Sequence, residues 1–169
     1  PPWAGAFVMK STGVAKDYRI PYFCRAVPVR SVPLPAGYVL APHQDEALAV
    51  LKGHGIRVER LLAGCRQQAE SYVLAAVEPG KVIYQGRVQN TLKGEYRREE
   101  AEIPAGSYYI GLDQPLARLV PVLLEPESAD GMAAWGFFNR VIVQQWSNRP
   151  GPYPVLRLDR RPAVPLLGE

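Results

Sequence analysis

Turns constrain this chain more than any other feature, because seventeen prolines and fifteen glycines punctuate its 169 residues. These two residue types make up about a fifth of the chain, against roughly 12% in an ordinary globular protein. Proline fixes φ and removes a backbone donor, and glycine favours tight turns. The elements must therefore be short, which excludes a bundle of long helices. With 47% apolar residues the chain can still bury one core.

The net charge of +4 is concentrated near the N-terminus. Residues 1–40 contain five basic side chains against Asp17, whereas residues 41–169 carry equal numbers of basic and acidic groups. The five basic residues are Lys10, Lys16, Arg19, Arg25 and Arg30. Because residues 1–35 also hold six prolines, we predict an extended connecting arm at 1–35 and a single domain at 36–169. The chain opens on Pro1 without an initiating methionine, which we interpret as a piece of a longer polypeptide.

The composition argues against a nucleic-acid partner and against a membrane span. Nucleic-acid binders carry a dense basic stripe interleaved with aromatic residues, and the spread-out charges of the arm do not form one. A binding module whose basic arm meets an anionic partner stays as an alternative. No apolar stretch approaches the ~20 residues that a membrane span needs. Cys24 and Cys65 do not form a Cys-x-x-Cys pair, and the sequence leaves open whether they form a disulfide. It also leaves the oligomeric state open.

The pattern over residues 38–62 predicts a βαβ-like unit. Residues 38–41 are a short apolar strand, and a helical pattern begins at Asp45 and ends at Gly53 or Gly55. Residues 56–61 then alternate apolar and polar side chains, as a half-buried strand does. Two strands joined in this way lie parallel.

The rest of the chain predicts a strand meander followed by short helices. Residues 69–112 are rich in β-formers and are broken by glycine-containing turns. A helix capped by Asp113 follows, with a kink or stop at Pro121. Residues 132–138 predict a second short helix that buries Trp135 and Phe138. The fold class is therefore α/β (α+β): a small mixed sheet with two or three short helices packed on it.

One spacing has the form of a metal site. His43 and Glu46 match His-x-x-Glu, which zinc hydrolases complete with a distant histidine, and His54 is the only other histidine in the chain. The two histidines would lie about 16 Å apart on one helix. A polar helix start explains the pattern more simply, so we predict no catalytic and no metal-binding residue, and we assign no substrate-binding residue.

Two sets of segments carry a resemblance to a known family. The first set is PAGYVLAP at 35–42 and HGIRVERL at 54–61; the second is LDQPLARL at 112–119, LLEPESADG at 123–131 and AWGFF at 134–138. Together they resemble the region that follows the catalytic domain in bacterial M14-type zinc carboxypeptidases. The resemblance covers about residues 35–158. Pro121 is where the sequence departs from it.

The resemblance implies an accessory role. In that family the zinc ligands, the general-base Glu and the Arg that binds the substrate carboxylate belong to the upstream domain, so His43 and Glu46 are not equated with them. We therefore expect a non-catalytic C-terminal domain that packs on its own upstream catalytic domain and shapes the substrate cleft. By this reading the fragment is no enzyme and holds no cofactor, and zinc belongs to the parent's catalytic domain.

Three further expectations concern the location of the protein, its clustered aromatic residues and an alternative function. A periplasmic or secreted location agrees with the resemblance, although the sequence leaves the location itself open. Trp135, Phe137 and Phe138 lie too close together all to face one core, so we expect one of them to cover a neighbouring surface. The alternative from another class is a stand-alone zinc hydrolase that uses His43, Glu46 and His54.

Overall fold

The computed structural model describes residues 10–25, 27–28, 31–144, 147 and 149–168. By its contacts the chain divides into two units, Pro1–Val32 and Pro33–Glu169. The described residues of the first unit form neither helix nor strand, and they are exposed. Arg30 of the predicted basic arm lies outside the described residues, and the connecting role of this arm stays a prediction. Across the described part of the chain, no helix is long and apolar enough to cross a membrane.

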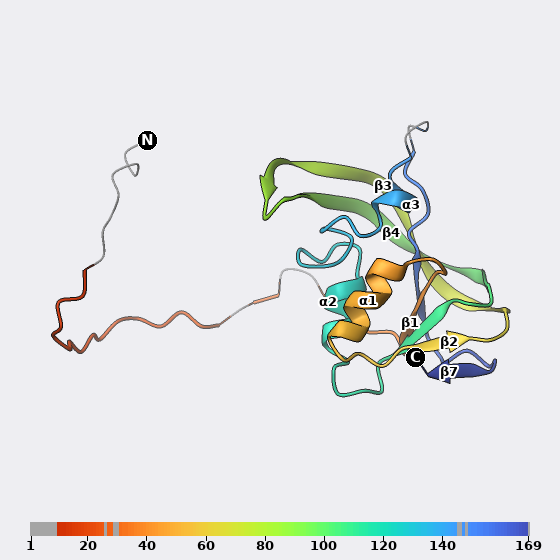
Figure 1. The fold of residues 1–169 in the computed structure, drawn as a ribbon, viewed down its shortest axis with the longest axis horizontal. Coiled ribbons are helices and arrows are strands. Elements are labelled where there is room, and N and C mark those ends of the chain that lie inside the picture. The colour runs from red at the N-terminus through yellow and green to blue at the C-terminus, as the bar shows by residue number, and fades with distance from the viewer. Residues whose placement is uncertain (1–9, 26, 29–30, 145–146, 148, 169) are drawn as a thin grey trace. The chain divides into compact units, whose positions relative to one another are not determined.

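The second unit is built on one seven-stranded sheet (Figure 1). Its strands are β1 (Gly37–Leu40), β2 (Glu59–Leu61), β3 (Cys65–Tyr84), β4 (Arg87–Ile103), β5 (Tyr108–Gly111), β6 (Val155–Leu158) and β7 (Leu166–Gly168). Their order is β4-β3-β6-β1-β5-β2-β7, and all neighbours pair antiparallel. The helices found in the described residues are α1 (Asp45–Gly53), α2 (Leu119–Leu124) and α3 (Asn139–Ile142). The predicted α/β class, a small sheet with short helices, is confirmed.

The βαβ-like unit is present, but its two strands are separated in the sheet. β1 and β2 both pair antiparallel with β5. They therefore run parallel to each other, and β5 lies between them. The local pattern predicts β1, α1 and β2, whereas β5, which lies between the two strands, begins almost fifty residues after β2.

Residues 69–112 are mostly strand, as predicted, but they form one long hairpin followed by a separate strand. β3 continues through Pro79 and Gly80, where turns are predicted, and the ladder to β4 is irregular near Leu74 and again near Pro79. The second irregularity accommodates Pro79, which cannot donate to the ladder. Gln85 and Gly86 close the hairpin, both with positive φ (49° and 77°), which suits the right-handed twist of the strands. β5 is not the neighbour of β4.

Side-chain alternation divides the apolar residues between the two faces of the sheet. Tyr38 and Leu40 face the main core, which also contains buried residues of α1, α2 and α3. Val39 faces a smaller cluster on the other side, together with Ile103 at the end of β4 and Leu61 of β2. Four strands lie between β4 and β2 in the sheet order. Because their side chains share one cluster, the sheet is strongly curled.

Two predicted helices differ from the structure. Residues 113–118 are turns, and α2 begins only at Leu119. Asp113 is not a cap; its carboxylate lies 3.2 Å from the Arg57 guanidinium. Pro121 falls in the first turn of α2, where its missing N–H would have had no partner in the helix. The predicted helix 132–138 is a series of turns, because Gly136 takes a positive φ of 79°.

Candidate functional site

The structure separates the three residues of the hypothetical zinc site. His43 precedes α1 and takes a positive φ of 62°, and Glu46 lies in the first turn. Both line a surface cleft of about 700 Å³ together with Arg140. His54 follows the last residue of α1, a helix about 13 Å long by its nine residues, and it does not line that cleft. Searched over the described ranges, no group of three or more His, Cys, Asp or Glu residues could hold a metal ion.

Both cysteines are free. Cys24 is exposed in the first unit, and Cys65 is half-buried at the start of β3. Partial burial raises the pKa of the Cys65 thiol, which lowers the fraction of thiolate near neutral pH. The geometry gives neither cysteine the environment of an activated nucleophile.

A buried arginine, Arg157, organises a polar cluster in the second unit. It lies in the middle of β6, opposite Tyr38 and Glu70 in the ladder, and its side chain is only 5% exposed. Its guanidinium contacts Glu70 at 2.9 Å and Glu125 at 3.4 Å. It also donates to the carbonyl of Pro33. A buried charge with these partners ties β6 to β3, to the end of α2 and to the start of the unit.

Tyrosine hydroxyls complete the coordination of Glu125. Tyr38 donates to one carboxylate oxygen at 2.5 Å, and Tyr96 donates to the other at 2.6 Å. The Arg157 guanidinium lies 4.5 Å from the centre of the Tyr96 ring, a cation–π distance. Burial, and then the hydrogen bond to Glu125, raise the pKa of Tyr38 and of Tyr96 far above the usual value. Both tyrosines therefore remain neutral donors.

This cluster was missed at the sequence level. The sequence pattern alone assigns no role to Glu125 or Glu127, yet Glu125 accepts two tyrosine hydroxyls and Glu127 accepts that of Tyr72 at 2.5 Å. The available signal was Arg157 itself, a lone charge within the apolar strand Val155–Leu158. A charge at such a position needs a buried partner.

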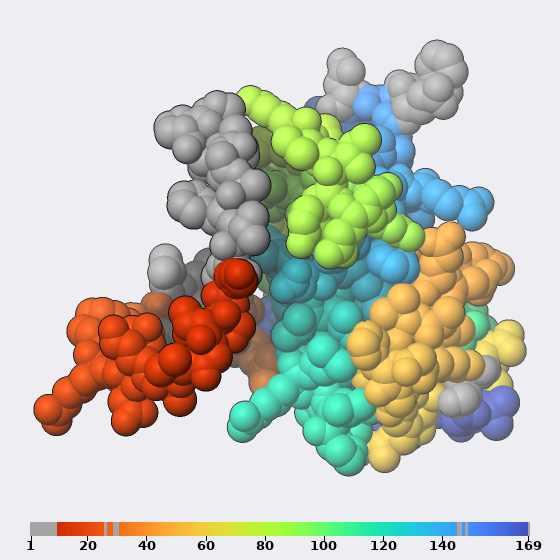
Figure 2. Space-filling model, turned by 60° about the vertical axis from the view of Figure 1, so that its left-hand side comes forward, coloured from red at the N-terminus to blue at the C-terminus, as the bar shows by residue number. Residues whose placement is uncertain are grey.

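The end of the β3–β4 hairpin carries three large apolar side chains that are mostly exposed. Val82 is 74% exposed, Ile83 70% and Tyr84 56%. The Tyr84 ring lies 6.1 Å from the ring of Trp135, which is half-buried. We call these four residues the hairpin-tip surface. Figure 2 shows this end of the hairpin, in lime green, standing out on the face of the molecule.

The hairpin is held by contacts to the loop before α3. Arg87 donates to the Trp135 carbonyl at 3.1 Å, and its guanidinium lies 4.9 Å from the centre of the Phe137 ring. The Asn90 backbone donates to Ala134 at 2.8 Å. Phe138 is fully buried, whereas Trp135 and Phe137 are only half-buried. Tip and loop therefore form one supported surface.

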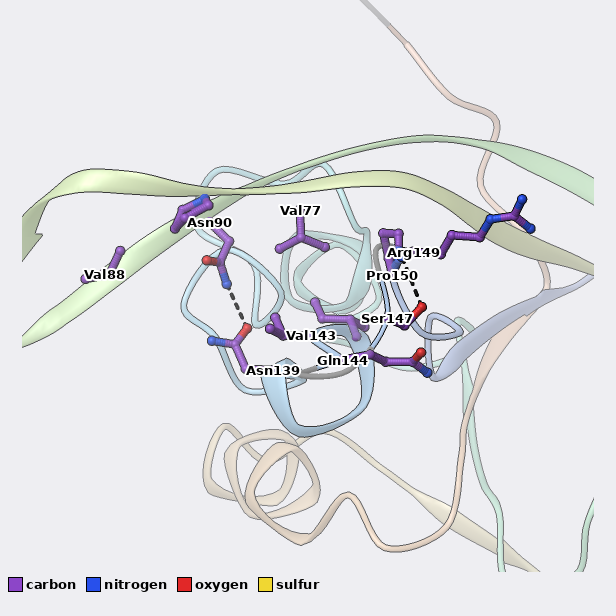
Figure 3. Close-up of a pocket in the computed structure, with 11 residues that line it drawn as sticks. Val77, Val88, Asn90, Asn139, Val143, Gln144, Ser147, Arg149 and Pro150 are labelled. Carbon is purple, nitrogen blue, oxygen red and sulfur yellow. Dashed lines mark hydrogen bonds between the residues drawn. The ribbon is translucent and has the colours of Figure 1, made fainter.

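A pocket of about 460 Å³ lies beneath the hairpin (Figure 3). Val77 and Val88 contribute apolar wall from the two strands, and Val143 contributes it from the segment after α3. A hydrogen bond of 2.7 Å joins Asn90 and Asn139 across one side. Gln144 and the charged Arg149 also line the pocket, so its wall is partly apolar and partly polar.

Comparison with known proteins adds one relationship. No protein-family model matches the chain, and no solved structure matches it. Three fungal proteins named carboxypeptidase 2 are similar: those of Trichophyton rubrum (27% identical over 79% of this chain), Trichophyton equinum (28% over 84%) and Trichophyton tonsurans (28% over 85%). The chain spans about a quarter of the length of these relatives, 23–26%. The similarity supports a carboxypeptidase-related domain.

Proposed function

We propose that this chain is a non-catalytic accessory domain of an M14-like zinc carboxypeptidase and packs on the catalytic domain of its own parent protein. The observation that carries the proposal is the hairpin-tip surface. The similarity to carboxypeptidase 2 supports the relationship. Because the chain corresponds to about a quarter of those relatives, the proposal assigns peptide hydrolysis and the zinc ion to the remaining part. The accessory domain would follow that part in the chain.

The arrangement of ionisable groups supports a structural role for the domain. The most buried charge, Arg157, is neutralised by Glu70 and Glu125, and the tyrosines that surround it donate to carboxylates. A proton-transfer group needs a pKa near the working pH. The pKa values of Tyr38 and Tyr96 lie far above that pH, so these tyrosines suit a rigid structural network better than a catalytic one.

The hairpin-tip surface suits a protein neighbour. Val82, Ile83 and Tyr84 are large and mostly exposed, and full burial of such a side chain is favourable by about 1.5–3 kcal/mol. Arg87 and Asn90 fix the hairpin to the loop before α3, so little conformational entropy would be lost on docking. A supported apolar tip next to a half-buried tryptophan has the composition of an interface centre.

The test compares the isolated chain with a longer protein that includes the catalytic domain. Hydrogen exchange of the backbone amides of residues 81–86 should slow at least about tenfold in the longer protein. Ile83→Asp should abolish this protection and lower peptidase kcat/KM. Leu167→Asp is the matched control, since Leu167 is 52% exposed on β7 at the opposite edge of the sheet. Equal exchange in both proteins, with Ile83→Asp behaving as Leu167→Asp, would show that the domain does not dock through its tip.

Zinc content provides a second and independent readout. Elemental mass spectrometry after dialysis without chelator should find almost no zinc in the isolated chain, and about one ion per molecule in the longer protein. One zinc per isolated chain that is lost in His43→Ala would instead identify the stand-alone hydrolase. That result would overturn the accessory role.

A further inference from the structure

The described residues between positions 10 and 32 share two properties: every one of them is exposed, and none lies in a helix or a strand. An endopeptidase holds several residues of its substrate in an extended conformation and hydrogen-bonds to their backbone, in the way that a strand adds to a sheet edge. A segment inside a folded unit must open locally before it can be held in this way, and that opening costs free energy. The described residues of the first unit need no such opening, so they are accessible to an endopeptidase.

Basic side chains give this segment its chemical character. Lys10, Lys16, Arg19 and Arg25 are all exposed. None of the four is followed directly by proline, which would restrict the residue before it and lacks a backbone N–H. Endopeptidases of the trypsin class carry an aspartate in the pocket that receives the side chain before the cleaved bond, and this aspartate selects a basic side chain. The four basic residues therefore match that class of enzyme.

The basic residues of the second unit are less accessible to such an enzyme. Most of them lie in the helices or strands, and Arg149 and Arg161 stand directly before prolines. The Arg57 N–H and the Arg160 carbonyl are each hydrogen-bonded to a distant side-chain amide. Arg118 directly precedes α2, so extending the backbone there would unwind the first turn of the helix. Cleavage within the second unit therefore requires a local opening that cleavage in the first unit does not.

The folded part of the second unit starts after this segment. The Pro33 carbonyl accepts a hydrogen bond from Arg157, and the Ala36 N–H donates to the Leu158 carbonyl at 2.8 Å. A cut at any of the four basic residues therefore removes no residue of the unit Pro33–Glu169. We expect the cut chain to keep the stability of the intact one.

We propose that residues 10–25 are a processing segment, which an endopeptidase of the trypsin class cuts after Lys or Arg so that the second unit is released intact. The chain is the substrate, and the enzyme is a separate protein. Water is the co-reactant: its oxygen becomes part of the new carboxylate on the basic residue, and a proton goes to the new amino terminus of the next residue. The cut itself does not depend on the proposed function. That the cut frees an accessory domain from a catalytic domain does rest on it.

The experiment digests the chain with a low concentration of trypsin and follows the products by mass spectrometry. Cleavage after the basic residues at positions 10–30 should be at least about a hundredfold faster than cleavage anywhere in residues 33–169, and the product should keep the thermal midpoint of the uncut chain. Endopeptidase Glu-C, which cuts after glutamate, is the matched control: the first glutamate of the chain is Glu46, so it should leave the chain uncut. First cuts at Lys81, Arg118 or Arg160, or fragmentation by Glu-C at a similar rate, would overturn the proposal.

A variant and the longer protein test the recognition and the processing role. The combined variant Lys10→Gln, Lys16→Gln, Arg19→Gln, Arg25→Gln and Arg30→Gln should lose the fast cut and keep its thermal midpoint; a fast cut that persists would contradict recognition of these side chains. In the longer protein, purified from the cells that produce it, the second unit should occur as a fragment that begins between residues 11 and 31. A longer protein that occurs only uncut there would overturn the processing role. Docking is measured separately, by hydrogen exchange of residues 81–86, so the two proposals can fail independently.

Discussion

Replacement of Arg157 by methionine should destabilise the second unit by about 3–5 kcal/mol, the cost of leaving the partner of a buried ion pair uncompensated. Arg157 is 5% exposed, and its partner Glu125 is 19% exposed, so water would screen the remaining carboxylate only weakly. Glu70 is 33% exposed and would contribute less. Since a typical domain is stable by about 5–15 kcal/mol, this loss is about a fifth or more of the total.

Urea unfolding followed by tyrosine and tryptophan fluorescence measures the effect. The double variant Arg157→Met/Glu125→Gln should recover about 1 kcal/mol or more of the loss, because it removes the uncompensated charge. Sodium chloride should change the unfolding free energy little, since buried pairs are screened less than exposed ones. A loss below about 1 kcal/mol for Arg157→Met, the range of an exposed pair, would refute the claim that this ion pair is effectively buried.

Two further perturbations test the tyrosines and the hairpin. Burial raises the pKa of Tyr38, Tyr96 and Tyr153 above the usual value. Above pH ~10 the unfolded chain therefore binds fewer protons than the native one. The free energy of unfolding should fall there by up to about 4 kcal/mol per pH unit for the three groups together. Denaturant unfolding between pH 8 and 11 measures this, and a flat profile above pH 10 would contradict the burial of these hydroxyls. Gly94→Ala should destabilise by about 1–3 kcal/mol, because its Cβ would overlap the carbonyl of the facing strand. Gly53→Ala, whose Cβ meets nothing within 4 Å, should instead stabilise by about 0.4–1 kcal/mol; thermal midpoints that move in the same direction for both would contradict this account.

Local patterns identified most of the elements of the second unit. Strand β1, helix α1 and strand β2 fall where apolar periodicity and glycine stops predict them. Their positions depend on side chains within a few residues of one another, which sequence patterns report directly. The predicted helix start at Asp113 was wrong, because Asp113 and Gln114 both bond to Arg57, almost sixty residues away, and α2 begins only at Leu119. Such a partner leaves no local signal.

The candidate site was harder to predict for the same reason. The hairpin-tip surface depends on β3 continuing through Pro79, and its support depends on the distant contact between Arg87 and the loop at Trp135. The expectation that one of the clustered aromatic residues lies at a surface was useful: Phe138 is buried, whereas Trp135 borders the tip.

The insertion of β5 between β1 and β2 has a consequence for how the chain folds. β1 lies between β5 and β6, and β6 lies near the opposite end of the chain. More than a hundred residues must therefore be synthesised after β1 before it has both neighbours, and its backbone groups that face β6 stay unpaired until then. Contacts of such wide sequence separation slow folding. The local hairpin of β3 and β4 can form earlier, and we expect it to be the scaffold on which the two ends of the chain later assemble.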